Sequence, residues 1–554
     1  MKKYVALLLS IIILVASFGC ATGSAPPPGG SATATTASSG GTATATTVAA
    51  TTANASPKIL RVGEDMSSLI TVNSLHTTYN NIFESSDAMS DQLIAKDPYT
   101  LELQPALLTK MPDISADGKT FTFELKQGVK FHNGDELTAK DCVFTFNRFF
   151  DPAYGNMNTW MADMILGAKE MVSAEGTITA LDSVKFIDDY HFSIELEYGY
   201  TAFLAVLAVA PLNIVPMDAC LAAGDRWGID VYYGTGPFMF KSFEPGVKLV
   251  MEKNPNYHGT AAKIDQIEVT HMEPSTALIE WEAGTIDVCA VDVSLVDGYL
   301  DDPEFADNVK FQEYVGIHTL NFNQELKPLD DVRVRTAIGL ATNSQALCDG
   351  YFKGHIRPAK SLIPQGIVGY DDSLPPLEYN PDRAKELLAE AGYPDGIEIT
   401  CTVRDTSSWV EIYQVLQEQY KLANITLHIE KVDAAGWLEK RGNGLVQFYM
   451  MNWYADFLDP DNFIYSLYHS SVADFFSTGN KDPEFDAALD AGRLLSYEAK
   501  QQYYADMEYK LSRETVAEWP LYAPAGYILV SDRVDNFFLK RDFLKTYITC
   551  DIIE

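Results

Sequence analysis

Apolar and polar side chains alternate most clearly over residues 121–126, FTFELK, where every second residue is apolar. This period of two predicts a strand with one buried face. Asn133-Gly134 then predicts a tight turn, because both residues tolerate positive φ. Thr138 and Asp141 predict a helix start, since the hydroxyl can accept a backbone N–H and the carboxylate suits the positive end of the helix dipole. By its pattern alone, this strand–turn–helix unit carries no chemistry.

Apolar residues recur at helical spacing in the second half of the chain. Asp331 precedes residues 332–343, VRVRTAIGLATN, whose apolar positions form one helical stripe. Asn380-Pro381 opens another helix with proline at its first position, and Gly392 closes it. Strand and helix patterns therefore both occur along the chain.

Residues 1–20, MKKYVALLLSIIILVASFGC, have the layout of an export signal, with two lysines, an apolar run and a small residue before a cysteine. We expect residues 1–19 to be a signal peptide. The ending resembles a lipoprotein box, in which Cys20 becomes the lipidated first residue, although Ser17 and Phe18 depart from that pattern. An ordinary signal peptide or an uncleaved anchor is the alternative. No second apolar run is long enough to span a membrane.

Residues 21–56 consist almost entirely of Ala, Thr, Ser and Gly and carry no charge. Such a segment buries too little apolar surface to offset the entropy lost on ordering. We therefore expect residues 20–57 to be a lipidated cysteine followed by a disordered tether, with the folded body beginning at Lys58. A flexible coil of this length spans roughly 30–35 Å. A glycosylated stalk is the alternative.

The chain has 554 residues and a formal net charge of −35. An acidic balance of this size repels polyphosphate, which argues against nucleic acid as a partner. The seven cysteines include no C-x-x-C motif and no Cys/His cluster of zinc-ligand spacing, so we expect neither a disulfide framework nor a zinc site. The motifs of serine hydrolases, metalloproteases and nucleotide-binding loops are absent, and we predict no enzyme and no cofactor.

Three carboxylates, Asp456, Asp459 and Asp461, lie close together in the sequence and could hold Ca²⁺. However, Pro460 and the absence of the required glycine break the spacing of an EF-hand loop. We therefore predict no metal site in this segment.

The exact residues of the strand–turn–helix unit are more informative than its pattern of apolar and polar positions. Residues 125–148, LKQGVKFHNGDELTAKDCVFTFNR, closely resemble the hallmark segment of the extracytoplasmic solute-binding proteins of family 5, the dipeptide- and oligopeptide-binding proteins of ABC importers. Residues 379–396, YNPDRAKELLAEAGYPDG, resemble the same family nearly throughout. With further similar segments at 92–123 and 249–259, the resemblance covers about residues 59–538.

This resemblance implies an α/β, bilobal fold of the periplasmic-binding-protein class II type, with an additional subdomain in the first lobe and two inter-lobe crossings. Residues 58–316 plus 522–554 would form lobe I, and residues 317–521 would form lobe II. The first crossing would lie at residues 315–323, and the chain would return to lobe I near residues 519–522.

The resemblance also implies a site for the amino end of a peptide. In dipeptide and oligopeptide binders, an aspartate that follows a tryptophan pairs with the α-ammonium group of the ligand, and Asp456 occupies that position in residues 450–463, MMNWYADFLDPDNF. An ammonium group stripped of water needs a full counter-charge and hydrogen bonds. Trp453 and Tyr454 beside it offer large apolar walls. A surface turn capped by aspartates is the alternative.

A second implied site would hold the carboxylate end. The dipeptide binders of the family place an arginine in the segment that corresponds to residues 400–409, TCTVRDTSSW, and Arg404 matches it by position. Guanidinium and carboxylate meet as a planar, two-pronged pair. A solvated arginine at a helix start is the alternative. Trp409 is a further candidate for the cleft wall, although a lone tryptophan more often belongs to the core.

Gly234-Thr235-Gly236 resembles an element of the family that continues with proline. Two glycines permit unusual φ values and close approach of another backbone, and Pro237 fixes the exit. Lining of the cleft and a tight turn beside a strand fit this pattern equally well.

The function we expect is that of a lipid-anchored, monomeric solute-binding protein outside the cytoplasmic membrane, which captures short peptides between its lobes and delivers them to an ABC permease. Relatives of this family that bind oligosaccharides or nickel chelates provide the first alternative. An exported hydrolase on the same scaffold is the second, and it would need a nucleophile–base pair that the sequence does not show. Ligand length and side-chain preference are left open.

Overall fold

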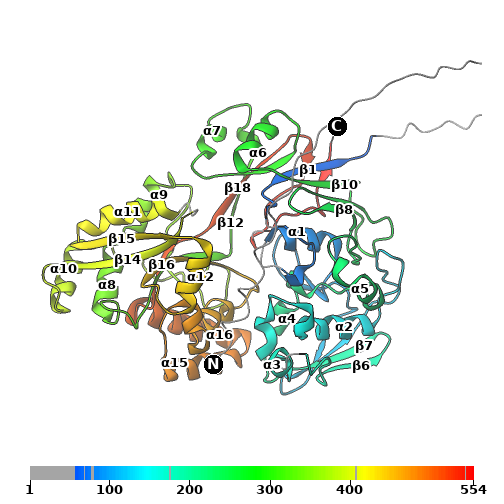
Figure 1. Ribbon diagram of the computed structural model, residues 1–554, viewed down its shortest axis with the longest axis horizontal. Coiled ribbons are helices and arrows are strands. Elements are labelled where there is room, and N and C mark those ends of the chain that lie inside the picture. Colours follow the sequence, from blue (N-terminus) through cyan, green and yellow to red (C-terminus); the bar gives the residue numbers. More distant parts are fainter. Residues whose placement is uncertain are drawn as a thin grey trace, which may run out of the picture. The chain divides into compact units, whose positions relative to one another are not determined.

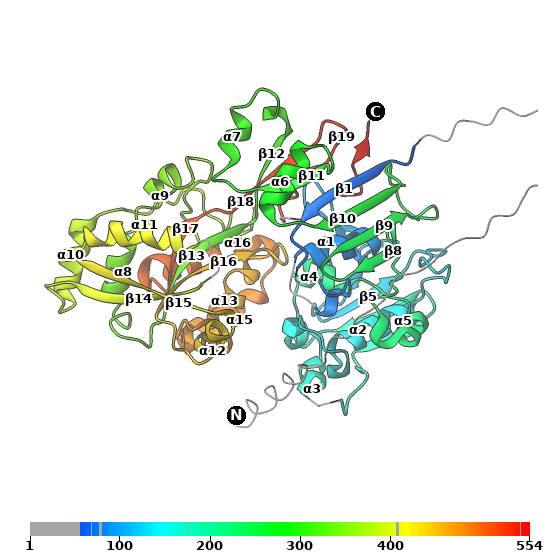
Figure 2. The ribbon, with the colours of Figure 1, turned by 45° about the horizontal axis from the view of Figure 1, so that its top comes forward.

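The computed structural model describes residues 56–67, 69–76, 80–173, 176–405, 409–542 and 544–553. The predicted signal peptide, Cys20 and the predicted tether up to residue 55 lie outside the described residues. The chain from residue 56 onward forms one compact unit, whose larger sheets have seven, five and four strands (Figures 1 and 2).

The seven-stranded sheet contains strands from the beginning, the middle and the end of the described chain. In spatial order they are Val309–Glu313 (β12), Ala525–Val530 (β18), Val288–Val291 (β11), Ile59–Glu64 (β1), Gln266–His271 (β10), Lys248–Lys253 (β9) and Phe238–Glu244 (β8). The central strand β1 is parallel to β10 and β11, and the outer pairs are antiparallel. The helices Pro274–Glu282 (α6) and Val296–Leu300 (α7) belong to this part of the chain.

The four-stranded sheet contains the strand predicted from the alternating pattern. Its order is Asp113–Ile114 (β4), Thr120–Glu124 (β5), His191–Glu195 (β7) and Val184–Asp188 (β6). Phe121 and Phe123 of β5 are fully buried, because the period of two turns both toward the core. The following helix, Ala139–Phe150 (α2), begins at the predicted residue, where the carboxylate of Asp141 accepts the backbone N–H of Thr138 at 2.9 Å.

The five-stranded sheet forms the centre of a second lobe. Its order is Ile425–Val432 (β15), Ile397–Arg404 (β14), Phe448–Tyr454 (β16), Gly316–Phe322 (β13) and Glu518–Tyr522 (β17). β14 is parallel to β15 and β16, whereas β13 is antiparallel to both of its neighbours and is buried throughout.

Both helices predicted in the second half of the chain, one from apolar spacing and one from its start and end residues, are present in the second lobe. They are Val332–Leu340 (α8), capped by Asp331, and Pro381–Glu390 (α10), capped by Asn380. The other helices of this lobe used below are Trp409–Lys421 (α11), Ala434–Gly442 (α12), Tyr465–Tyr468 (α13), Ala473–Phe476 (α14), Pro483–Arg493 (α15) and Tyr497–Tyr509 (α16).

The chain passes twice between the lobes, at neighbouring places. β12 of the seven-stranded sheet leads into β13 of the five-stranded sheet, and β17 leads back into β18. The two outgoing and two returning strands pair with each other, β12 with β18 and β13 with β17. Below, "first lobe" means the seven- and four-stranded sheets with their helices, and "second lobe" means the five-stranded sheet with its helices. The predicted limits of these lobes in the sequence stay a prediction.

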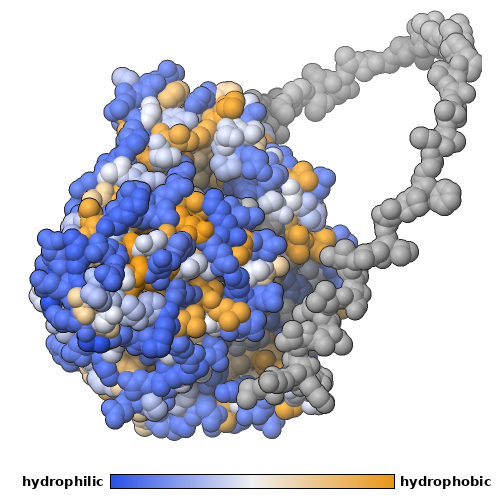
Figure 3. Space-filling view, turned by 60° about the vertical axis from the view of Figure 1, so that its left-hand side comes forward, coloured by the Kyte–Doolittle hydropathy of each residue, from blue (hydrophilic) through white to orange (hydrophobic). Residues whose placement is uncertain are grey.

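The surface is mainly hydrophilic, with scattered apolar groups, on the face that Figure 3 shows. The six cysteines within the described residues are buried and free. Among these residues, none of the helices has the length and apolar character needed to cross a membrane.

Candidate ligand-binding site

A cavity of about 700 Å³ lies between the two lobes. Side chains from both lobes line it, and those used below are Asp163 and Tyr198 of the first lobe and Trp453, Asp456, Asp461, Tyr465, Phe476, Asp490 and Arg493 of the second. Its walls combine aromatic rings with a few charged groups, as is usual for sites that hold small ligands.

The carboxyl edge of the five-stranded sheet explains why residues 400–409 and 450–463 come together. β14 and β16 are parallel, so Arg404 at the end of β14 and Trp453 near the end of β16 lie at the same edge. Ligands of open α/β sheets characteristically bind outside this edge. Both crossings also meet it, because β13 begins there and β17 ends there.

Asp456 follows β16 and exposes its side chain to the cavity. Its carboxylate accepts a hydrogen bond from the Asn462 amide at 3.2 Å, and its own backbone N–H donates to Asn462 Oδ1 at 3.0 Å. Surrounding protein raises the pKa of this carboxyl above its usual value, while Asn462 and the more distant Lys96 act in the opposite direction. The side chain is open to solvent in the cavity and yet ringed by protein, so its charge is only partly screened.

Trp453 lines the same cavity as Asp456, and its predicted contact with a ligand stays a prediction. Its indole N–H donates to Asn462 Oδ1 at 3.3 Å, and its ring meets the Phe476 ring edge-on, with centroids 5.9 Å apart. Tyr454 does not join it, because successive strand residues point to opposite faces. Tyr454 instead lines a separate cavity of about 600 Å³ and meets the Tyr314 ring edge-on at 6.0 Å.

Arg404 and Trp409 lie at the edge of the sheet but do not line the cavity with Asp456. Arg404 is exposed. Burial lowers the pKa of Arg441, and the positive charge of Arg404 lowers it further. The Arg441 guanidinium lies 4.6 Å from the Phe475 ring centroid. Trp409 meets the ring of His318 edge-on at 5.8 Å. Burial lowers the pKa of His318 to about 3, so this histidine is neutral at physiological pH. The predicted contact of Arg404 with a ligand carboxylate stays a prediction.

Gly234-Thr235-Gly236 packs inside the first lobe. A Cβ atom at Gly234 would lie 2.1 Å from the backbone oxygen of Met89, and one at Gly236 would lie 2.5 Å from the Met89 carbonyl carbon. Only glycine permits this approach of two backbones. Thr235 is fully buried and donates to the Asp91 carboxylate at 2.9 Å. Packing against the Met89 backbone therefore explains why glycines occupy positions 234 and 236. None of the three residues lines the inter-lobe cavity.

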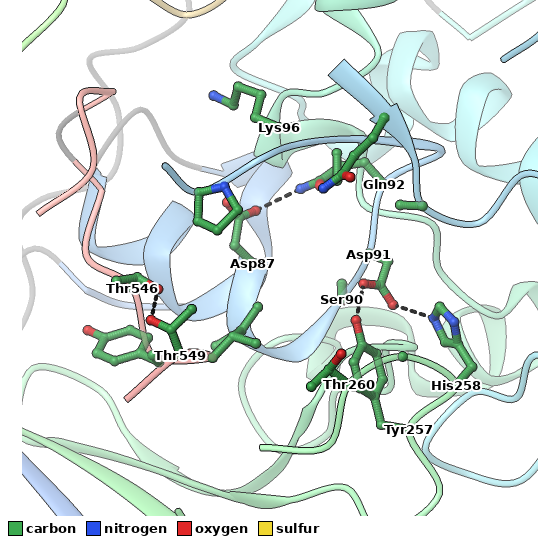
Figure 4. A pocket seen from close by; sticks show the side chains of 18 of the residues that line it. Asp87, Ser90, Asp91, Gln92, Lys96, Tyr257, His258, Thr260, Thr546 and Thr549 are labelled. Atoms are coloured by element: carbon green, nitrogen blue, oxygen red, sulfur yellow. Dashed lines mark hydrogen bonds and ion pairs between the residues drawn. The ribbon is translucent and has the colours of Figure 1, made fainter. Parts of the chain in front are cut away.

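Asp91 connects that packing unit to another cavity, of about 630 Å³, in the first lobe. Figure 4 shows its carboxylate between Tyr257, which donates at 2.9 Å, and His258, whose Nε2 lies 2.9 Å away. Asp87 lines the same cavity and accepts from Gln92 at 2.7 Å. Burial raises the pKa of Asp87 to about 6. The carboxylates of this cavity therefore already have partners within the protein.

The aspartates considered for Ca²⁺ have cationic side chains as partners. Lys500 Nζ lies 2.8 and 2.7 Å from the two carboxylate oxygens of Asp459, and Arg493 Nε lies 2.9 Å from Asp461 Oδ2. Among the described residues, the structure contains no cluster of histidine, cysteine and acidic side chains able to hold a metal ion. Sequence reasoning did not identify these cations, because Lys500 is 41 residues from its partner and no local pattern marks the pair.

Two lobes joined by paired crossings, with a partly polar cavity between them, define a protein that holds a small solute in a cleft. The chain belongs to the bacterial extracellular solute-binding proteins of family 5, since the model of the middle region of that family matches residues 102–475, more than half of the chain. It is thus a solute-binding protein and not an enzyme, as the sequence predicted.

Relatives of known function support the same family. The heme-binding protein A of Haemophilus influenzae is 27% identical over 83% of this chain and 86% of its own length. The dipeptide-binding protein of Escherichia coli is 28% identical over 73% of this chain and 77% of its own length.

Solved structures confirm the predicted bilobal fold. The periplasmic binding protein DppA of Helicobacter pylori, in complex with the peptide STSA, superimposes with a TM-score of 0.74 at 23% identity, covering 90% of this chain and 98% of the other. The murein tripeptide binding protein MppA of Escherichia coli has a TM-score of 0.76 at 19% identity, with coverage of 90% and 99%. At these identities the likeness concerns the fold.

Proposed function

We propose that this protein captures short peptides in the cavity between its lobes and delivers them to an ABC permease. The observation that supports this most directly is the position of Asp456, a carboxylate on the cavity wall at the carboxyl edge of the second-lobe sheet. The dipeptide-binding relative and the peptide complex of the structural relative agree with this ligand class. The proposed lobes are residues 58–316 plus 522–554 and residues 317–521.

The α-ammonium group of a peptide would pair with Asp456. Transfer of an ammonium ion from water into a protein cavity is unfavourable unless a counter-charge and hydrogen bonds replace its hydration. Asn462 already orients the Asp456 carboxylate, so this side chain loses little conformational entropy when a ligand binds. The indole of Trp453 would cover the first residues of the peptide.

The carboxylate end of the peptide would reach Arg404. Arg404 and Asp456 lie at the same edge of one sheet, which suits the two ends of a short chain. Closure of the lobes about the paired crossings would bring the first-lobe wall over the ligand. The cavity volume of about 700 Å³ is in the range of sites that hold small ligands, about 300–1,000 Å³.

The test compares free and N-acetylated Ser-Thr-Ser-Ala by isothermal titration. For the wild type, acetylation should weaken binding by about 30-fold to several thousand-fold, the range of 2–5 kcal/mol for loss of one partner of a buried charge pair. Asp456→Asn should weaken binding of the free peptide similarly and remove most of the effect of acetylation. Asp490→Asn provides the matched control, because Asp490 lines the same cavity at 62% side-chain exposure.

Normal binding of the free peptide by Asp456→Asn, together with a harmless acetylation, would rule out the ammonium site. A peptide would then be held through other groups. If no short peptide binds the wild type, the ligand is another solute of the family, and a thermal shift with an oligosaccharide or a nickel chelate would indicate which.

We also propose that Cys20 anchors the protein to the outer side of the cytoplasmic membrane through lipid chains. The export-signal layout of residues 1–20 and the uncharged segment behind it support this location. Two or more acyl chains bury enough CH₂ groups, at about 0.8 kcal/mol each, for stable anchoring.

A further inference from the structure

The turn that carries Asp456 is fixed by its own lobe on one side. It continues through Asp459 and Asp461, which are only 4% and 2% exposed. Lys500 of α16 neutralises Asp459, and Tyr504 of the same helix donates its hydroxyl to Asp461 Oδ1 at 3.0 Å. Asn462, the next residue, is the one that orients the Asp456 carboxylate. The buried aspartates are therefore connected to the proposed ligand contact by one short segment.

The first lobe reaches the same carboxylate from the opposite side. Tyr200 lies a few residues after β7 and is fully buried. Its hydroxyl donates to Asp461 Oδ2 at 2.8 Å, so the two oxygens of Asp461 receive tyrosine hydroxyls from different lobes. Thr201 makes a further contact across the lobes, from its hydroxyl to the backbone oxygen of Leu495 at 3.5 Å.

Arg493 joins the lobes at the same place. Its guanidinium is paired with Asp461 of its own lobe and with Asp163 of the first lobe, at 2.9 and 3.2 Å. It lies over the first-lobe rings of Tyr198 and Tyr200, 4.7 and 5.0 Å from their centroids. On its own side it lies 3.9 Å from the ring centroid of Tyr465. With only 3% of the residue exposed, this cation depends on both lobes for its surroundings.

The residue that follows Asp456 also packs across the lobes. Phe457 is 2% exposed and belongs to the hydrophobic cluster of the four-stranded sheet, which contains Phe121 and Phe123 of β5. The turn is thus held by an apolar contact and by a network of charges, both of which involve the first lobe.

We propose that Tyr200, Asp163 and Arg493 form an inter-lobe clasp on Asp461, and that this clasp positions the turn carrying Asp456 when the lobes close. Separation of the lobes removes the Tyr200 hydroxyl from a buried carboxylate and removes one carboxylate and two ring faces from Arg493. Buried polar groups without partners are unfavourable, so the clasp favours the closed form even without ligand. The apparent affinity of a ligand that needs the closed form scales with the population of that form. The effect on peptide affinity rests on the proposed function, whereas the effect on closure does not.

Tyr200→Phe and Tyr504→Phe form a matched pair of variants. Each removes one hydroxyl from the same Asp461 carboxylate and keeps the ring, but only Tyr200 belongs to the first lobe. Both rings are fully buried, so each variant removes a hydroxyl from an equally buried position and keeps the packing of the ring. Closure without ligand is measured with cysteines introduced at Thr201 and Leu495, as the rate at which a short bis-maleimide joins them. The six described native cysteines are buried and react slowly by comparison.

Tyr200→Phe should slow the joining reaction about 10-fold and weaken binding of Ser-Thr-Ser-Ala about 10-fold, which corresponds to about 1.4 kcal/mol. Tyr504→Phe should change both quantities less than about twofold, although its melting temperature should fall, since it also loses a hydrogen bond to a charged group.

Equal effects of the two variants, or no effect of Tyr200→Phe on the joining rate, would overturn the clasp. If no short peptide, Ser-Thr-Ser-Ala included, binds the wild type, the peptide proposal fails, and the joining rates still decide on the clasp.

Discussion

Replacement of Lys500 by methionine should reveal how strongly the buried charges hold the Asp456 turn. Lys500 is 0% exposed, and its ammonium group lies within 2.8 Å of both Asp459 oxygens. Methionine preserves much of the side-chain volume and removes the charge together with the N–H donors. Asp459 retains one hydrogen bond, from the backbone N–H of Asp461 at 3.1 Å. Even in the wild type, burial raises the pKa of the Asp459 carboxyl against the opposing effect of Lys500.

Without Lys500, Asp459 should bind a proton when the protein folds. An aspartate of the unfolded chain has a pKa of about 3.9, so its protonation costs about 4 kcal/mol at pH 7 and about 1.5 kcal/mol at pH 5. Because the folded-state pKa is raised in the variant, its stability falls as the pH rises above that unfolded value. Lys500→Met should therefore be destabilised by about 4 kcal/mol at pH 7, within the range of about 3–5 kcal/mol for breaking a buried ion pair, and by much less at pH 5.

Urea unfolding followed by tryptophan fluorescence measures this difference at both pH values. The double variant Asp459→Asn/Lys500→Met is the control, because it has no buried carboxylate at this position and should differ from the wild type by the same amount at pH 5 and pH 7. A destabilisation of Lys500→Met that does not change with pH, or that stays below about 1 kcal/mol at pH 7, would refute the reasoning, since a buried pair should exceed the surface range of about 0–1 kcal/mol.

Two further outcomes follow from the buried acid of the second crossing and from the export signal. Glu518 of β17 is 1% exposed, and burial raises its pKa to about 8, while the nearby Tyr468 and Thr319 side chains act in the opposite direction. Stability from this group is present below its unfolded pKa and is lost as the pH rises toward 8. The free energy of unfolding of Glu518→Gln relative to the wild type should therefore increase by about 4 kcal/mol between pH 4.5 and pH 8. Urea unfolding across this range tests the expectation, and a constant difference contradicts it. Cys20→Ser should move the protein from the membrane to the soluble fraction in cell fractionation, and retention of the processed variant in the membrane would contradict lipidation.

Local elements and family membership could be read from the sequence. The alternation over residues 121–126 predicted β5, and the caps at Thr138, Asp331 and Asn380 predicted the starts of α2, α8 and α10. These features depend on side-chain periodicity and on hydrogen bonds between residues a few positions apart, which a sequence contains directly. The wording of residues 125–148 predicted the family that the comparison then confirmed.

The candidate site depended on tertiary structure at several points. Trp453 and Tyr454 are neighbours with the same aromatic character, yet the pleat of β16 turns only Trp453 toward the cavity with Asp456. Gly234 and Gly236 follow a family motif, yet the backbone of Met89 occupies the space beside them. Sequence similarity could not decide between cleft lining and packing, because both require the same two small residues.

The partners of Asp461 show most clearly what only the folded chain decides. Tyr200 lies 261 residues before Asp461, and Tyr504 lies 43 residues after it, but their hydroxyls reach the two oxygens of one carboxylate. No local sequence pattern predicts these contacts. They form when two lobes that are distant in sequence pack around a buried carboxylate. The sequence by itself determined the local elements and the family; the tertiary structure decided which side chains surround Asp456 and which lobe supplies them.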